Sequence, residues 1–259
     1  MTRPLRITVA LAIVAAVVAA NVVRRHAPVK GVDVYIDYNG CDTLETAGRV
    51  IAAVTQQIPA LSAMRVKDVD TKTVAAVVAR SPYLTRERVT VSLGGHLVVH
   101  ARQRRPVLRV YCAGECFYVD ESGVTMPLSP VGSCDITIAN GHFKQKLADG
   151  HGSVDLAGWL ADSARSHYTL AQLWKLADFL HRNDDALARY DQIFITPKGD
   201  FCLVPDWAGF TVVLGTTERL DEKMRHLQRF AERVLPVKGD TYTEVSLKYN
   251  RQIVCRKRQ

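Results

Sequence analysis

The apolar pattern of the chain begins with one long uncharged run. Residues 7–23 are apolar apart from Thr8 and Asn21 and carry no charge. As a helix, with a rise of about 1.5 Å per residue, this run would be roughly 25 Å long, at the short end for crossing a bilayer. The basic residues beside it, whose long side chains can reach the headgroups, are Arg3, Arg6, Arg24 and Arg25. The pattern predicts a transmembrane helix over residues 7–23, preceded by a tail of residues 1–6.

The same run has features of a cleaved signal peptide. It has a basic start, an apolar middle and small residues over 18–20 where cleavage could occur. No helix breaker precedes that point, and the apolar run continues to Val23, which favours an uncleaved anchor. Both interpretations make the run an export signal, so we expect the bulk of the chain outside the cytoplasm. The flanking basic residues are balanced, so the positive-inside rule does not set the orientation.

Residues 30–103 carry the pattern of a β-α-α-β-β unit. Val32, Val34 and Ile36 alternate with polar residues, as in a half-buried strand. Asp42 and Glu45 have capping-box spacing, which predicts a helix starting there. The apolar stripe of that helix is Leu44, Ala47, Ile51, Val54 and Ile58.

A second helix and a hairpin complete this unit. The helix begins at Asp70 and is closed by Pro82. Two alternating strands follow, joined by the Gly94-Gly95 pair that is typical of a two-residue hairpin turn.

Residues 104–255 are rich in short strands with two longer helical stripes. Strands are predicted at 107–111, 117–119, 124–127, 136–138, 193–204 as a hairpin, and 210–214. One helix follows Thr169. The other has the stripe Leu220, Met224, Leu227, Ala231 and Val234. A last strand puts Val245, Leu247 and Tyr249 on one face, and residues 256–259 form a basic tail. The fold class is α+β, with helices packed on a strand-rich β domain.

Composition and charge add little to this picture. The chain has 259 residues, 47% hydrophobic and 23% charged, with a formal net charge of +8. The basic residues are spread along the chain, which favours a solvated surface. Aromatic residues are not interleaved with basic ones, so we expect no nucleic-acid platform.

Catalytic motifs are missing from the sequence. It has no G-x-S-x-G, no H-E-x-x-H and no glycine-rich phosphate loop. His96 and His100 are too far apart on a strand to share a metal ion. We therefore expect no enzyme activity, no cofactor, no metal and no small-molecule substrate. Among the six cysteines, Cys112 and Cys116 are the close pair, and a local disulfide or two buried thiols are both open.

Several local patterns resemble the FtsQ/DivIB family of bacterial cell-division proteins. Residues 73–84, followed by VTVSLGG at 89–95, resemble the second half of its POTRA domain. RRPVL at 104–108 resembles the junction into its β domain, without the acidic residue that sometimes precedes it. FYVDESGVTMPL at 117–128 is similar to its y-v-D-x-x-G hairpin.

The C-terminal patterns continue the resemblance. SLKY at 246–249 stands where the family has D-L-R-Y, and NRQIVC at 250–255 is most similar to the Bacteroidetes branch. The resemblance implies a POTRA domain over 30–103 and a β domain over 104–255.

The resemblance also implies a role. FtsQ proteins are non-catalytic, single-pass proteins of the bacterial inner membrane, with the N-terminus in the cytoplasm and the bulk in the periplasm. They bind FtsB and FtsL, contact other divisome proteins through the POTRA domain and help assemble septal cell-wall synthesis. The partner-binding residues that the resemblance implies are Tyr242, Val245, Leu247, Tyr249 and Ile253. The alternative is that the odd-numbered apolar residues face the core and the backbone of the edge strand binds the partner.

Two other functions fit parts of the pattern. One is a POTRA-containing component of protein export or envelope assembly. The other is a secreted periplasmic protein with a cleaved signal.

Overall fold

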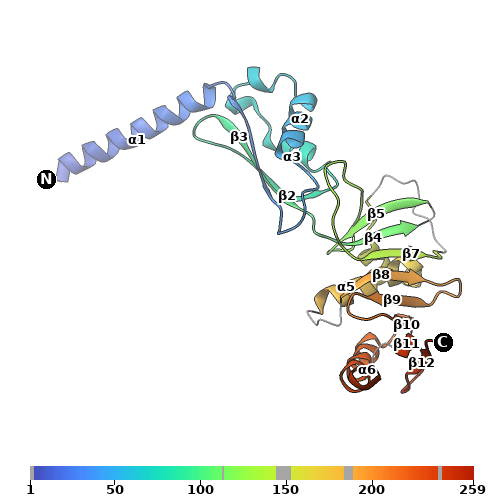
Figure 1. Cartoon of the computed structure of the whole chain (residues 1–259). Helices are drawn as coiled ribbons and strands as arrows, with labels where there is room; N and C mark the ends of the chain where they lie inside the picture. The colour runs from blue at the N-terminus through green and yellow to red at the C-terminus, as the bar shows by residue number, and fades with distance from the viewer. Residues whose placement is uncertain (1–2, 113, 144–152, 184–188, 239–240) are drawn as a thin grey trace. The chain divides into compact units, whose positions relative to one another are not determined.

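The computed structural model describes residues 3–112, 114–143, 153–183, 189–238 and 241–259 (Figure 1). The chain divides into two compact units, Met1–Arg104 and Arg105–Gln259. Each unit has its own cluster of buried apolar side chains. The mixture of helices and strand-rich sheets confirms the predicted α+β class.

The predicted N-terminal helix forms, and it is α1 (Arg3–His26). Its first residues fall in the predicted tail over 1–6, of which residues 1–2 lie outside the described part. The large apolar side chains that it exposes are Leu11, Ile13, Val14, Val17, Val18, Val22 and Val23. A search of the described residues found no helix with both the length and the apolar character needed to cross a membrane. The predicted transmembrane span over 7–23 is therefore not supported.

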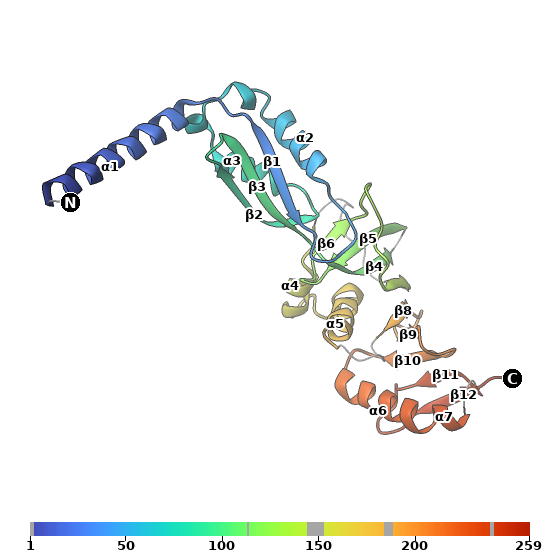
Figure 2. The ribbon, with the colours of Figure 1, turned by 60° about the vertical axis from the view of Figure 1, so that its left-hand side comes forward.

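The rest of the first unit has the element order β-α-α-β-β (Figure 2). Its elements are β1 (Gly31–Asp37), α2 (Ala47–Gln57), α3 (Thr71–Val78), β2 (Leu84–Val91) and β3 (His96–Gln103), with 3₁₀ turns η1 (Leu61–Ala63) and η2 (Val66–Asp68). The described strands form a three-stranded sheet in the order β1-β3-β2. β1 runs parallel to β3, whereas β2 and β3 form the predicted antiparallel hairpin.

Helix α2 starts later than the capping-box spacing predicted. Its N-cap is Thr46, whose side chain accepts a hydrogen bond from the Arg49 N–H. The buried side chain of Gln103 explains the shift, because its Oε1 accepts hydrogen bonds from the Leu44 and Glu45 N–H groups. These donors are thereby satisfied outside a helix. On this helix Val50 is buried, whereas the predicted position Ile51 is only partly buried.

The second unit is built on one mixed sheet. Its strands are β4 (Pro106–Cys112), β5 (Glu115–Asp120), β6 (Thr125–Pro127), β7 (Ile138–Gly141), β8 (Tyr190–Ile195), β9 (Phe201–Pro205), β10 (Thr211–Gly215), β11 (Tyr242–Ser246) and β12 (Val254–Lys257). These nine described strands are ordered β12-β11-β10-β9-β8-β7-β4-β5-β6. The helices are α4 (Leu156–Ala161), α5 (Thr169–Arg182), α6 (Leu220–Arg233) and α7 (Leu235–Lys238).

Two parallel pairings fix where the longer helices lie. β7 is parallel to β8, and β10 is parallel to β11. Parallel neighbours need a crossover connection, and α5 and α6 lie in these two connections. Leucines of both helices are fully buried in one core with strand residues such as Ile193 and Val245. The helices therefore cover one face of the sheet.

Gly141 ends β7 at a point where no side chain fits. Its φ is +115°, and a Cβ added there would collide with the backbone of Ile195 on the neighbouring strand. Gly199 has a similar φ of +84°, but nothing lies within 4 Å of the position that its Cβ would take.

We expect Gly141→Ala to lower the free energy of unfolding by about 2–4 kcal/mol, because it adds a backbone collision to the strain of a positive φ. Gly199→Ala is the matched control and adds strain alone, at about 1 kcal/mol. Urea denaturation of both variants measures the difference. Equal losses in the two variants would contradict the close packing of β7 on β8.

Candidate functional site

The candidate site is the C-terminal edge of the second sheet. After α6 and α7 the chain returns as β11, which pairs in parallel with β10, so that Val245 lies opposite Val212. β12 then pairs antiparallel with β11, with Cys255 opposite Val245. β12 is the terminal strand in the order of the described sheet. One side of its backbone therefore has no strand beside it within the described residues.

The five predicted partner-binding residues do not form one surface. Val245 is 0% exposed and Leu247 is 3% exposed, and both belong to the core. Ile253 and Tyr242 pack against that core, and the Tyr242 ring lies 5.8 Å from the ring of Phe230. The exposed member is Tyr249, at 51%.

The reason is that β11 is an interior strand. β10 and β12 pair with its two sides, and α6 covers its core face. The alternative noted from the sequence, in which the apolar side chains of this strand face the core, holds for Val245 and Leu247.

β12 (Val254–Lys257) was not identified as an edge strand from the sequence. Val254 is 46% exposed on this terminal strand, and Arg256 and Lys257 follow it. The sequence contains a signal for such a strand. The apolar pair Ile253-Val254 stands next to the basic run 256–258, and charged residues beside an apolar strand are typical of a protected sheet edge. The sequence pattern instead predicts a basic tail over residues 256–259. In the structure Arg256 and Lys257 belong to β12, and the Arg256 guanidinium lies 3.7 Å from the carboxylate of Glu244 on β11.

Backbone hydrogen bonds show which donors of β12 face outward. The Arg258 N–H donates to the Thr241 carbonyl, 2.8 Å away, on the side of β11. Donors alternate in direction along an antiparallel strand, so the N–H groups of Cys255 and Lys257 face the free side.

Two polar contacts hold the β11–β12 connection in place. The Lys248 ammonium donates to the Asp200 carboxylate at 2.7 Å, and this hydrogen bond raises the pKa of Lys248. The Arg219 guanidinium donates to the Asn250 side-chain oxygen at 2.7 Å. These contacts tie the connection to the β9 hairpin and to the start of α6. The edge is thus organised before any partner arrives, which reduces the entropy lost on binding.

Helix α6 is fixed by a buried lysine. Lys223 is 5% exposed, and its ammonium donates to the carbonyls of Leu214 and Thr216 at 2.8 and 2.7 Å. Burial, followed by the nearby charge of Arg219, lowers the pKa of Lys223. The lysine thus caps the end of β10 and holds the crossover helix against it.

The cysteine pair cannot form a local disulfide in this arrangement. Cys112 lies opposite Glu115 in the β4–β5 ladder, whereas Cys116 lies opposite Tyr111. Neighbouring positions on a strand face opposite sides of the sheet, so the two thiols point apart. Burial, with a smaller effect of Glu115, raises the pKa of the Cys112 thiol to about 11.

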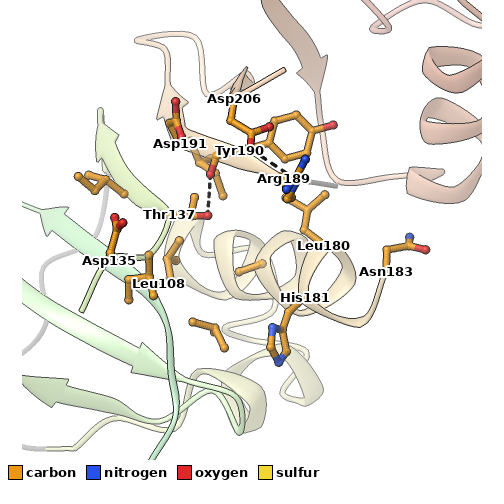
Figure 3. A pocket seen from close by; sticks show the side chains of 15 residues that line it. Leu108, Asp135, Thr137, Leu180, His181, Asn183, Arg189, Tyr190, Asp191 and Asp206 are labelled. Atoms are coloured by element: carbon orange, nitrogen blue, oxygen red, sulfur yellow. Dashed lines mark hydrogen bonds and ion pairs between the residues drawn. The ribbon is translucent and has the colours of Figure 1, made fainter. Parts of the chain in front are cut away.

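A cavity of about 1050 Å³ lies elsewhere in the second unit, beside the end of α5 (Figure 3). Its lining includes Asp135, Asp191 and Asp206, and the Asp206 carboxylate lies 3.5 Å from the Arg189 guanidinium. Across the cavity the Thr137 hydroxyl donates to the Tyr190 carbonyl at 2.7 Å. The described lining pairs no nucleophile with a base, and we assign it no chemistry.

The second unit matches a known protein family. A family model described as FtsQ/DivIB, C-terminal related, matches residues 105–256, which is more than half of the chain. The matched range begins at the first residue of the second unit and ends within β12. No curated protein matches the chain.

We expect Lys223→Met to lower the free energy of unfolding by about 1–3 kcal/mol at neutral pH, because two buried carbonyls lose their donor. The stability difference between the wild type and this variant should also change with pH. The folded-state pKa of Lys223 lies below 10.5, so between these two values the unfolded chain binds more protons. As pH rises through that window, Lys223 loses its charge in the folded chain and the cost of burying that charge disappears. The free energy of unfolding of the wild type therefore rises relative to that of the variant.

Urea denaturation at neutral pH and at alkaline pH measures both effects. Lys238→Met, at an exposed lysine of α7, is the control and should change neither quantity. A stability difference between wild type and Lys223→Met that stays constant with pH would contradict the assignment.

Proposed function

Because the chain belongs to the FtsQ/DivIB family, we propose that it is a non-catalytic scaffold of the cell-division machinery that offers the free edge of β12 to a partner strand. The family is one of non-enzymatic division scaffolds, which supports a role in septation. The observation that carries the proposal is the position of β12 at the end of the sheet.

The chemistry of recognition is backbone pairing. A partner strand would accept hydrogen bonds from the outward N–H groups of Cys255 and Lys257, and main-chain bonds of this kind give affinity. Exposed Val254 and Tyr249 flank this backbone and supply apolar contact area to the same partner. The partners proposed for this edge are FtsB-like and FtsL-like membrane proteins, and other divisome proteins would contact the first unit as a POTRA domain.

We also propose that α1 attaches the chain to the inner membrane, with the N-terminus in the cytoplasm and the bulk in the periplasm. The support is the set of large apolar side chains that α1 exposes from Leu11 to Val23, which have no cover within the described residues. An exposed apolar surface of this kind marks a membrane or protein contact.

The edge is tested with Lys257→Pro and its matched control Lys257→Ala. Proline removes one outward N–H and leaves the β11 ladder intact, whereas alanine removes the side chain alone. We expect proline to weaken binding of the FtsB-like partner about tenfold or more, which equals about 1.4 kcal/mol, and alanine to leave it nearly unchanged. Titration of the full chain with the partner's extracytoplasmic segment gives both affinities.

The same variants can be tested in cells depleted of the wild-type chain. Lys257→Ala should restore septation and Lys257→Pro should not. Equal binding by the two variants, or affinity capture that recovers neither FtsB-like nor FtsL-like proteins, would refute the edge as the site.

Membrane attachment is tested by extracting membranes with alkaline carbonate. We expect the full chain to stay in the membrane fraction. Val14→Asp with Val18→Asp should move it to the soluble fraction, because carboxylates oppose burial of the helix in lipid. Lys67→Asp, at an exposed position of η2, changes the net charge by the same amount and is the control. Mass spectrometry of the N-terminus decides between anchor and signal peptide, since a mature chain starting near Asn21 would overturn the anchor.

A further inference from the structure

The sheet of the first unit has one face that its helices do not cover. Buried residues such as Leu97 and Val99 face α2 and α3 in the core. The alternate residues of β3, among them His100, face the other way. Buried residues of α2 and α3, such as Val54 and Val74, lie in this same core. The opposite face is therefore open to solvent within the first unit.

Charges on this face are sorted by strand. Among the described strands, β1 and β2 are the two edges of this sheet. β1 carries Asp33 and Asp37, and β2 carries Arg86 and Arg88. Between them lies His100, opposite Arg88 in one ladder and opposite Tyr35 in the other. The Tyr35 and His100 rings stack at 5.3 Å. An acidic column and a basic column thus flank a stacked pair of rings.

The two aspartates of the acidic column have basic partners on β3, whereas the two arginines of the basic column have no ion-pair partner among the described residues. The Asp33 carboxylate lies 3.2 Å from Nδ1 of His96, and the Asp37 carboxylate lies 3.5 Å from Nε of Arg102. Neither Arg86 nor Arg88 has an ion-pair or hydrogen-bond partner among the residues that the structure describes. Two exposed guanidinium groups on β2 are therefore available to a ligand.

The backbone brings Arg86 to this position under strain. The β2–β3 ladder skips a residue between Thr85 and Arg88, which is a β-bulge, and Arg86 has a φ of +55°. A positive φ is costly for a residue other than glycine, and bulges re-aim side chains. The bulge places Arg86 at a depression of about 380 Å³ whose lining also includes Tyr35, His100 and Arg102.

We propose that this face docks an acidic peptide segment of a partner protein, with carboxylates on Arg86 and Arg88 and an apolar side chain on the Tyr35–His100 pair. Guanidinium groups bind carboxylates in a planar, two-point geometry that suits side chains on an extended peptide. The aromatic pair gives an uncharged contact between the charged columns.

A peptide fits the sorted charges better than a membrane surface does. An anionic bilayer is broad and would meet the carboxylates of β1 together with the arginines of β2. A narrow peptide can follow the basic column and avoid Asp33 and Asp37. The site rests on the proposed contact of the first unit with other division proteins. Because Lys257→Pro alters the second unit alone, failure at either site can be distinguished from failure at the other.

The test uses the full chain in detergent and a fluorescein-labelled peptide of alternating glutamate and valine, with a glutamine-for-glutamate peptide for comparison. Arg86→Asn with Arg88→Gln removes both free guanidinium groups, and asparagine tolerates the positive φ. We expect about tenfold weaker binding of the acidic peptide, which corresponds to about 1.4 kcal/mol. Lys67→Gln with Lys72→Gln removes the same net charge from exposed positions elsewhere in the unit and should weaken binding no more than about twofold.

Position is tested separately by Tyr35→p-benzoylphenylalanine, which should crosslink the acidic peptide on irradiation, while the same residue at Lys67 should not. Crosslinking also tests the position of the bound peptide if the double arginine variant fails to fold. Equal losses in the two double variants, or crosslinking at Lys67 but not at Tyr35, would overturn the site. Binding to phosphatidylglycerol vesicles with no binding of the peptide would overturn it in favour of a lipid contact.

Discussion

The parallel pairing of β10 with β11 is the constraint on which the candidate site depends. Two parallel neighbours cannot be joined by a tight turn, so the chain must cross one face of the sheet between them. Helix α6 makes that crossing, and Lys223 fastens it to the end of β10 through two carbonyls. The crossing places β11 beside β10 and covers Val245. The chain then returns as β12, which makes β11 an interior strand and leaves β12 as the edge of the described sheet.

Local signals in the sequence predicted much of the fold. The Gly94-Gly95 pair marked the β2–β3 hairpin, and helical stripes located α5 and α6. These features depend on residues a few positions apart. The start of α2 could not be predicted in this way, because the side chain that displaces it, Gln103, is nearly sixty positions away in the chain.

The candidate site was harder to predict for a related reason. Alternation showed that Val245, Leu247 and Tyr249 share a pattern, but alternation does not say which strands lie on either side. Burial of Val245 follows from the cover of α6 over this face, and the pairing of β11 with β10 joins segments separated by that helix. The residues left for a partner are those on β12, whose basic side chains made the strand look like a solvated tail.

The fastening of the β11–β12 connection has a mechanical consequence. Lys248 pins one side of this connection to Asp200, and Arg219 pins the other side through Asn250. A partner strand that pulls along the axis of β12 loads the hydrogen bonds to β11 in shear, so they resist together. A pull at right angles from the free end would break the same bonds one after another. The direction of tension between two tethered proteins would then decide how long their junction lasts.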